Sequence, residues 1–216
     1  MSTARASDAP RKPGRPSDRA KRAAILEAAT HSFFERGFAA TSIEQVAADA
    51  GVSKVTIYNH FGDKRTLFTA AVDRECEKIR GHFSIGEAQG QSVADTIRDR
   101  LTAIGEAMVA FLYRPEMLQF ERRIAAETES DPEIGRAFLE AGPWRMKEAF
   151  AAFLEHAAAE GDLVIEDHGA AAEQFVSMCK GMGDLGRRFG ARPEPGENAV
   201  RIRGAVDVFL AAYGKR

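Results

Sequence analysis

The chain has 216 residues, 44% of them hydrophobic, and a formal net charge of −2. This length and composition predict a folded protein of one large domain or two small ones. We expect neither an exported nor a membrane protein but a cytoplasmic one, because no apolar run approaches the ~18 residues of a bilayer span and no apolar signal-peptide core follows the first residues. Cys76 and Cys179 have no metal or disulfide spacing, so we expect two buried thiols, no metal and no cofactor.

The small net charge conceals an uneven distribution. Residues 1–22 contain seven Lys or Arg residues against two acidic residues, whereas residues 66–216 contain 19 basic and 25 acidic residues. A basic end on an acidic body is a common mark of nucleic-acid contact, and a basic tail that only aids solubility is an equally open interpretation. Residues 1–17 are rich in Ala, Ser, Pro, Arg and Gly, which predicts a flexible basic arm.

Helical spacing begins at Asp18, and apolar residues recur every three or four positions until Gly37, a natural helix end. A second helix begins at Thr41 or Ser42, since each can form a capping box, and it ends at Gly51.

Residues 43–61 have the pattern of a helix-turn-helix unit. Ser53 is best interpreted as the cap of a short third helix that stops at Gly62. Ile57 and Phe61 share one face of this helix and, with Val52, anchor it on the preceding helix. Polar side chains remain elsewhere on its surface, namely Lys54, Thr56, Tyr58, Asn59 and His60. Short donors, an amide and a cation near a helix N-terminus suit a DNA groove and its phosphates.

The rest of the chain has a helical pattern throughout. After a fourth helix and a loop near 81–91, helices are predicted over about 92–113, 115–128, 131–141, 143–160, 167–189 and 194–213. The segment DLVIED is too short to predict a strand. The predicted fold is therefore all-α, with an N-terminal three-helix head and a C-terminal helical bundle.

The stretch TSIEQVAADAGVSKVTIYNHFGDKRTLF, residues 41–68, resembles the helix-turn-helix signature of TetR-family bacterial transcriptional regulators. The resemblance covers roughly residues 18–68, and GRPSDR at 14–19 is similar to the arm that often precedes the signature. The stretch from DPEIGRAFLEAGPWRMKEAF to GDLVIEDHGAAAEQF looks like one common C-terminal subtype.

This resemblance implies a ligand-responsive, DNA-binding transcriptional regulator, a repressor released from a palindromic operator by a small-molecule effector. Residues 18–65 would bind the operator, and residues 66–216 would bind the effector and form a homodimer.

The resemblance also implies individual DNA contacts. Phosphates would be met by Thr41 or Ser42, Tyr58, His60 and Lys64. Base edges or nearby sugars would be met by Lys54, Val55, Thr56 and Asn59. Arg15 would reach a minor groove from the arm, as basic arms do elsewhere. Val55 departs from the glycine often found at its position, which leaves the operator sequence open.

Apolar stripes on the last two predicted helices suit self-association, because helix-turn-helix proteins usually dimerise. One stripe comprises Phe175, Met178, Met182, Leu185 and Phe189, and the other comprises Val206, Phe209, Leu210 and Tyr213. An ordinary intrachain core would produce the same stripes. The resemblance implies an intersubunit four-helix bundle, and close helix approach would offset the cost of Gly181, Gly183 and Gly186 in a helix interior.

The middle helices supply large apolar residues for an effector pocket: Met108, Phe111, Met117, Phe120, Trp144 and Phe150. Any one of them is equally suited to a plain core. Arg122 and Arg123 would suit an acidic effector or simply cover a helix surface, whereas Glu106 or Glu121 would suit a cationic one.

An enzyme is not expected, because no Ser-His-Asp order, phosphate-binding loop, HExxH motif or paired-cysteine site occurs. GMGDLG, residues 181–186, lies within a predicted helix and follows no strand, so it does not indicate a nucleotide site. A helical adaptor that docks proteins stays as an alternative, and the steep salt dependence of phosphate contacts would distinguish the two.

Overall fold

The computed structural model describes residues 18–83, 96–192 and 194–215. The predicted arm with Arg15, and most of the predicted loop near 81–91, lie outside these ranges. Every element of regular secondary structure within these ranges is a helix. Leu163 and Gly214 form an isolated antiparallel β-bridge. The all-α prediction is confirmed. None of these helices is both long and apolar enough to cross a bilayer.

Three helices form the head, namely α1 (Asp18–Arg36), α2 (Ile43–Asp49) and α3 (Lys54–Phe61). Ser42 and Ser53 are the N-caps of α2 and α3, and each hydroxyl accepts a hydrogen bond from a backbone N–H three residues on. The turn between them requires Gly51, whose φ of +64° is disfavoured for residues with a Cβ atom. Short helices of this kind depend on their caps and on packing, since their own propensity is weak.

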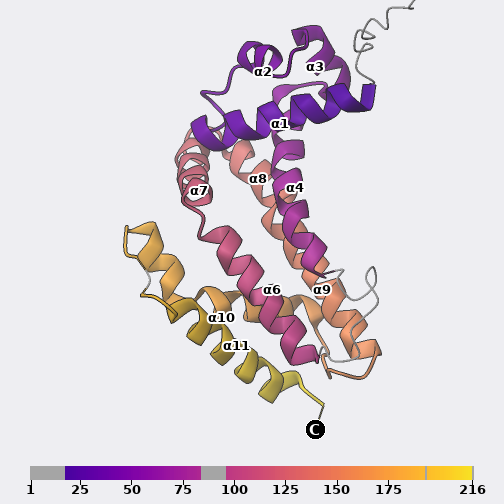
Figure 1. Cartoon of the computed structure of the whole chain (residues 1–216), viewed down its shortest axis with the longest axis vertical. Helices are drawn as coiled ribbons and strands as arrows, with labels where there is room; N and C mark the ends of the chain where they lie inside the picture. Colours follow the sequence, from indigo (N-terminus) through magenta and orange to yellow (C-terminus); the bar gives the residue numbers. More distant parts are fainter. Residues whose placement is uncertain (1–17, 84–95, 193, 216) are drawn as a thin grey trace, which may run out of the picture.

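Within the described ranges the body comprises seven helices: α4 (Lys64–Phe83), α6 (Ile97–Leu112), α7 (Pro115–Thr128), α8 (Pro132–Ala141), α9 (Pro143–Ala159), α10 (His168–Arg188) and α11 (Glu197–Tyr213). Helices α7, α8 and α9 each begin with proline, which fits the first helical position because its missing N–H has no intrahelical partner there. Figure 1 shows the head at the upper end, α4 running down beside α8 and α9, and α6, α10 and α11 at the lower end.

The buried apolar residues form two clusters. The division between these clusters does not coincide with residues 65/66, where the head was expected to end and the body to begin. The head-side cluster combines the buried residues of α1–α4 with those of α7 and α8, such as Phe120 and Ile134. The far-side cluster combines those of α6, α9, α10 and α11, such as Phe150 and Phe175. The head therefore shares its core with the upper half of the body.

Candidate DNA-binding face and effector cavity

Helix α3 has one buried and one exposed face. Ile57 and Phe61 are buried in the head-side cluster, as the spacing of four residues predicts. Lys54, Val55, Tyr58 and Asn59 are exposed, and the Thr56 hydroxyl lies 2.9 Å from that of Ser53. The two apolar anchors fix the helix so that its N-terminal and outer side chains face solvent.

The two alternatives at the start of α2 differ in exposure, and the Ser42 hydroxyl donates a 3.0 Å hydrogen bond to Glu44. Thr41 is buried, and its hydroxyl donates a 2.7 Å hydrogen bond to the Gly37 carbonyl. The Ser32 hydroxyl in turn donates to Thr41 at 3.3 Å. Thr41 therefore ties α2 to the end of α1 and cannot meet a phosphate in this conformation. Ser42 is exposed.

His60 and Lys64 are held more closely by the protein than expected. The His60 side chain is only 12% exposed, and its Nε2 lies 3.3 Å from the carboxylate of Asp18. Lys64 donates a 3.2 Å hydrogen bond to the Ala39 carbonyl, and its Nζ lies 4.6 Å from the Phe38 ring centroid. Burial lowers the pKa of Lys64. Both side chains contribute to the structure of the head as well as being candidates for DNA contact.

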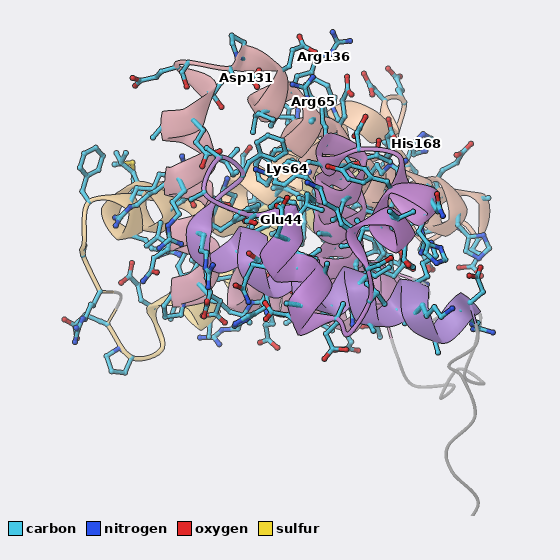
Figure 2. All side chains as sticks on the ribbon, turned by 90° about the horizontal axis from the view of Figure 1, so that it is seen from above. Glu44, Lys64, Arg65, Asp131, Arg136 and His168 are labelled. Atoms are coloured by element: carbon cyan, nitrogen blue, oxygen red, sulfur yellow. The ribbon has the colours of Figure 1, made fainter. Side chains whose placement is uncertain are left out.

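Lys54, at the first position of α3, forms an ion pair with Glu44 in the first turn of α2. The hydrogen bond from Lys54 lowers the pKa of Glu44 to about 2, and the same bond raises the pKa of Lys54. Both side chains are largely exposed. Figure 2 looks down on the head and shows Glu44 together with Lys64. A phosphate that binds Lys54 has to compete with this carboxylate.

Polar contacts at the top of the body hold the head in place. The Glu127 carboxylate of α7 accepts backbone N–H bonds from Phe38 at 3.1 Å and Ala39 at 3.0 Å. Arg123, one turn earlier, donates to the Phe34 carbonyl at 2.9 Å.

A further link joins α4 to α8, where Arg65 pairs with Asp131 at 3.3 Å; both are labelled in Figure 2. Sequence analysis missed these contacts, because their partners are 66 to 89 positions apart and no local pattern marks them.

A cavity of about 900 Å³ opens between the two clusters. All six residues proposed for an effector pocket line it: Met108, Phe111, Met117, Phe120, Trp144 and Phe150. Phe34 of α1 also lines it and stacks on Phe120, with ring centroids 4.1 Å apart. Its walls thus come from both clusters and reach the first helix of the head.

Charged residues also line the cavity. Glu75 is buried and paired with Lys78 at 2.5 Å and Arg114 at 3.2 Å. Glu121 lies 3.4 Å from Arg187, and its burial raises the pKa of its carboxyl.

The other charged candidates do not line the cavity: Glu106, Arg122 and Arg123. Arg122 donates to the carbonyls of Arg187 and Arg188, and Arg123 donates to that of Phe34.

The expected dimer face needs correction. Phe175, Val206 and Phe209 are fully buried in the far-side cluster, so they are intrachain core and cannot form an interface. Met178, Leu210 and Tyr213 are partly buried against the same cluster. The inward face of an amphipathic helix has the same i, i+3, i+4 spacing as an interface, and sequence alone does not separate the two.

The exposed members of the proposed stripes lie at the end of α10. Met182 is 76% exposed and Phe189 is 85% exposed, and Leu185 is exposed beside them. Helix α11 exposes Val200 and Val208, which sequence analysis missed because they do not lie on the stripe that points inward.

Helix α10 is interrupted at Gly181, whose φ of 47° and ψ of −154° are not helical. A Cβ atom there would lie 2.9 Å from Cδ of Arg201 in α11, and one on Gly183 would lie 2.5 Å from its Nη2. The glycines therefore make room for an arginine side chain, whereas close approach of a second helix was expected.

Both cysteines are buried and free, as their apolar surroundings predict. Burial raises the pKa of Cys76 to about 11 and that of Cys179 to about 12.

Comparisons with known proteins cover both parts of the molecule. Residues 25–71 match the family profile described as bacterial regulatory proteins, tetR family. Residues 99–215 match the profile of the AefR-like transcriptional repressor, C-terminal domain. The chain is 33% identical over 92 residues to the HTH-type transcriptional activator FasR of Mycolicibacterium smegmatis, a match that covers 43% of this chain and only 40% of FasR.

Two solved structures resemble almost the whole chain. A TetR-family regulator from Mesorhizobium loti MAFF303099 has a TM-score of 0.74 and 28% identity, over 93% of this chain and 100% of that one. The flavonoid-responsive regulator FrrA has a TM-score of 0.68 and 30% identity, over 91% of this chain and 98% of that one.

Proposed function

The chain belongs to the TetR family of bacterial transcriptional regulators, and from this premise we propose that it is a repressor that leaves its operator when a small molecule fills the cavity. It is a DNA-binding regulator and not an enzyme. One observation carries the proposal: the cavity separates the cluster that contains the head from the cluster that contains α10 and α11. The proposal of repression is supported by the profile matched over residues 99–215, which describes the C-terminal domain of a repressor.

An effector can change DNA binding only if it has different affinities for two arrangements of the protein. Phe34 and Phe120 offer a physical route, because both line the cavity and stack on each other where α1 meets α7. A ligand that displaces Phe120 also displaces Phe34, and with it the helix on which α2 and α3 pack. In a dimer, such a tilt changes the separation of the two heads.

The proposed DNA contacts centre on the N-terminal half of α3. Lys54, Val55, Thr56 and Asn59 face base edges or sugars, and Tyr58 faces a phosphate. Ser42 takes the phosphate contact in place of the buried Thr41. His60 now pairs with Asp18, and Lys64 donates to the Ala39 carbonyl. Each can donate to a phosphate only if this contact breaks or if the side chain bonds both partners at once.

The proposed homodimer forms through the exposed residues at the end of α10 and along α11. Met182, Leu185 and Phe189 supply the apolar surface of α10, and Val200 and Val208 supply that of α11. Large apolar side chains that are exposed close together, as Met182, Leu185 and Phe189 are at the end of α10, are typical of an interaction surface. Dimerisation places two copies of α3 on two half-sites about one helical turn of DNA apart or a multiple of that.

The first experiment selects binding sites for the purified protein from a pool of random DNA duplexes at two salt concentrations. We expect enrichment of a palindrome. Lys54→Ala should weaken binding to it and lower the slope of log affinity against log salt by about 1, if Lys54 contacts a phosphate. Lys147→Ala, on α9 and remote from the head, is the matched control and should have no effect.

Absence of any enriched sequence at either salt concentration, with protein refolded to remove bound effector, would contradict the proposal and favour the adaptor. A palindrome that no cavity ligand releases would leave DNA binding intact but contradict effector control.

A further inference from the structure

One end of the cavity contains a cation that the protein leaves without a hydrogen bond. Lys180, on α10, lines the cavity. Its Nζ lies 3.6 Å from Asp184, beyond hydrogen-bonding distance, and no other described residue accepts a hydrogen bond from it. Asp184 is already engaged more closely by Arg187 at 3.0 Å and by Arg188 at 3.1 Å.

Positive charge exceeds negative charge around Lys180. Three cations, Lys180, Arg187 and Arg188, share the two carboxylates of Asp184 and Glu121. Arg187 is buried, and its Nε has no hydrogen-bond partner among the described residues. Burial raises the pKa of Glu121. Lys180 is only 30% exposed and shares its carboxylate with two arginines, so this end of the cavity favours an anion.

The other charges at the cavity are already compensated. Glu75 accepts from Lys78 and Arg114, as described above. At the edge of the cavity, Lys147 lies at the same 3.6 Å from Glu173, but no other described cation pairs with that carboxylate, whereas Asp184 is shared by three cations. Arg136 pairs with Glu140 at 2.8 Å. The remaining lining is mainly apolar, from Phe34 and Val72 at one side to Phe150 and Val176 at the other.

The interruption of α10 fixes the position of Lys180. The chain leaves helical geometry at the next residue, Gly181, and the Lys180 carbonyl instead accepts a 3.3 Å hydrogen bond from the Tyr113 hydroxyl. Arg201 occupies the space above Gly181 and Gly183. The cation is thus held beside the cavity by a break that the surrounding residues maintain.

We propose that the effector is an amphiphilic anion, with a large apolar body that fills the cavity and one carboxylate or similar group that Lys180 binds. This inference rests on the proposed function, in which the cavity binds the effector. A volume of about 900 Å³ lies near the upper end for small-molecule sites, which fits a long or multi-ring body. A cationic effector is disfavoured, because the three carboxylates that line the cavity each already pair with a cation: Glu75, Glu121 and Glu173.

The single tryptophan gives a direct assay that does not depend on DNA. Trp144 lines the cavity and is 47% exposed, so a bound apolar molecule changes its fluorescence. The probes are a long-chain alkyl carboxylate and the alcohol and ammonium of equal chain length, each below its micelle-forming concentration. The carboxylate should bind about tenfold or more tightly than either analogue, as expected for a charge-assisted contact.

Lys180→Met keeps the length of the side chain and removes its charge. It should reduce carboxylate affinity to that of the alcohol and leave alcohol affinity unchanged, whereas Lys180→Arg should retain the preference. Lys147→Met removes the same charge at the edge of the cavity, where Glu173 has no other described cation partner, and it should retain the carboxylate preference. Operator binding without ligand shows that each variant is folded.

Equal affinities of the wild-type protein for the three probes, no response to any of them, or a carboxylate preference that survives Lys180→Met would each overturn the inference. The proposed function is contradicted by a different result. A carboxylate could bind through Lys180, as measured by Trp144 fluorescence, and yet not release the operator. That result would support this site and contradict effector control.

Discussion

The two hydrophobic clusters are similar in construction but differ in what they leave exposed. The head-side cluster presents polar side chains at its outer end, where Ser42, Lys54 and Asn59 lie around the start of α3. The far-side cluster presents apolar ones, with Met182 and Phe189 more than three-quarters exposed. Exposed polar groups on a rigid helix suit DNA, whereas exposed apolar groups mark a surface that is completed by another protein. In the proposed function, each cluster therefore faces a different partner.

The cavity between the clusters is the basis of the proposed coupling between DNA binding and effector binding. Within each cluster the packing is close, as Gly105 illustrates: a Cβ atom there would lie 2.9 Å from Ile202. Between the clusters the packing is interrupted by about 900 Å³ of space. Movement is less costly along such a boundary than through a close-packed core.

The largest expected effect comes from comparing a substitution in the core of the far-side cluster with one on its surface. Phe209→Ala removes a fully buried ring and should reduce the free energy of unfolding by about 3–5 kcal/mol. Phe189→Ala removes an exposed ring and should change monomer stability by about 0.5 kcal/mol or less, but weaken the dimer. Denaturant unfolding and sedimentation measure the two effects. Equal loss of stability in both variants would contradict the division of α10 and α11 into inward and outward faces.

A smaller effect should follow from loosening the head from α7. Glu127→Gln removes the charge that accepts two backbone N–H bonds, and should cost about 1–2 kcal/mol. Amide hydrogen exchange at Phe38 and Ala39 should accelerate, while exchange in α10 stays unchanged. The control is Glu129→Gln, an exposed carboxylate just after the same helix. Unaltered exchange at Phe38 would show that the carboxylate does not hold the head.

Removal of the exposed Lys54–Glu44 ion pair on the DNA-binding face should have a smaller effect, and it should increase operator affinity. Glu44→Gln frees Lys54 and removes a negative charge near the phosphates, so operator affinity should rise about threefold. Asp49→Asn, on the same helix but bonded to Gln45, is the control.

The Lys54–Glu44 pair also has a defined pH dependence. The pKa of Glu44 is lowered from 4.5 to about 2, so the pair contributes to folding above pH 4.5 and loses its contribution as pH falls through about 2. Equal stability of wild type and Glu44→Gln at every pH would contradict this assignment.

The smallest expected effect concerns the thiols, one in each cluster. With pKa values of about 11 and 12, Cys76 and Cys179 are almost entirely protonated near neutral pH and should be alkylated far more slowly than a free thiol. A cavity ligand should slow alkylation of Cys76, which lines the cavity, and leave Cys179 unaffected. Mass spectrometry after timed alkylation measures both. Protection of Cys179 alone would place the ligand elsewhere.

Local signals in the sequence were sufficient to predict the described helices and which side of α3 is exposed. Asp167 caps α10 and Pro132 starts α8 as expected, because caps and prolines act within one turn. The outward position of Tyr58 also follows from local spacing. Helix α11 begins at Glu197, three residues later than expected, after a turn that ends at Gly196.

Long-range contacts limited the prediction of the sites. Whether Phe209 faces its own chain or another depends on which helix packs against it, and periodicity does not encode that choice. The burial of Thr41 depends on Ser32 and Gly37 approaching it from α1. The charge balance at Lys180 depends on residues from α7 and α10 that meet only after folding.

The length of α3 also limits how much sequence information one molecule can extract from DNA. Eight residues span only ~12 Å, or three to four base pairs. By chance, a four-base-pair word recurs about once every 250 base pairs, too often to single out one promoter among the competing sites of a genome. Two such words at a fixed spacing recur about once every 65,000 base pairs. In the proposed dimer, the exposed apolar residues of α10 and α11, far from any base, therefore determine the selectivity of regulation as much as α3 does.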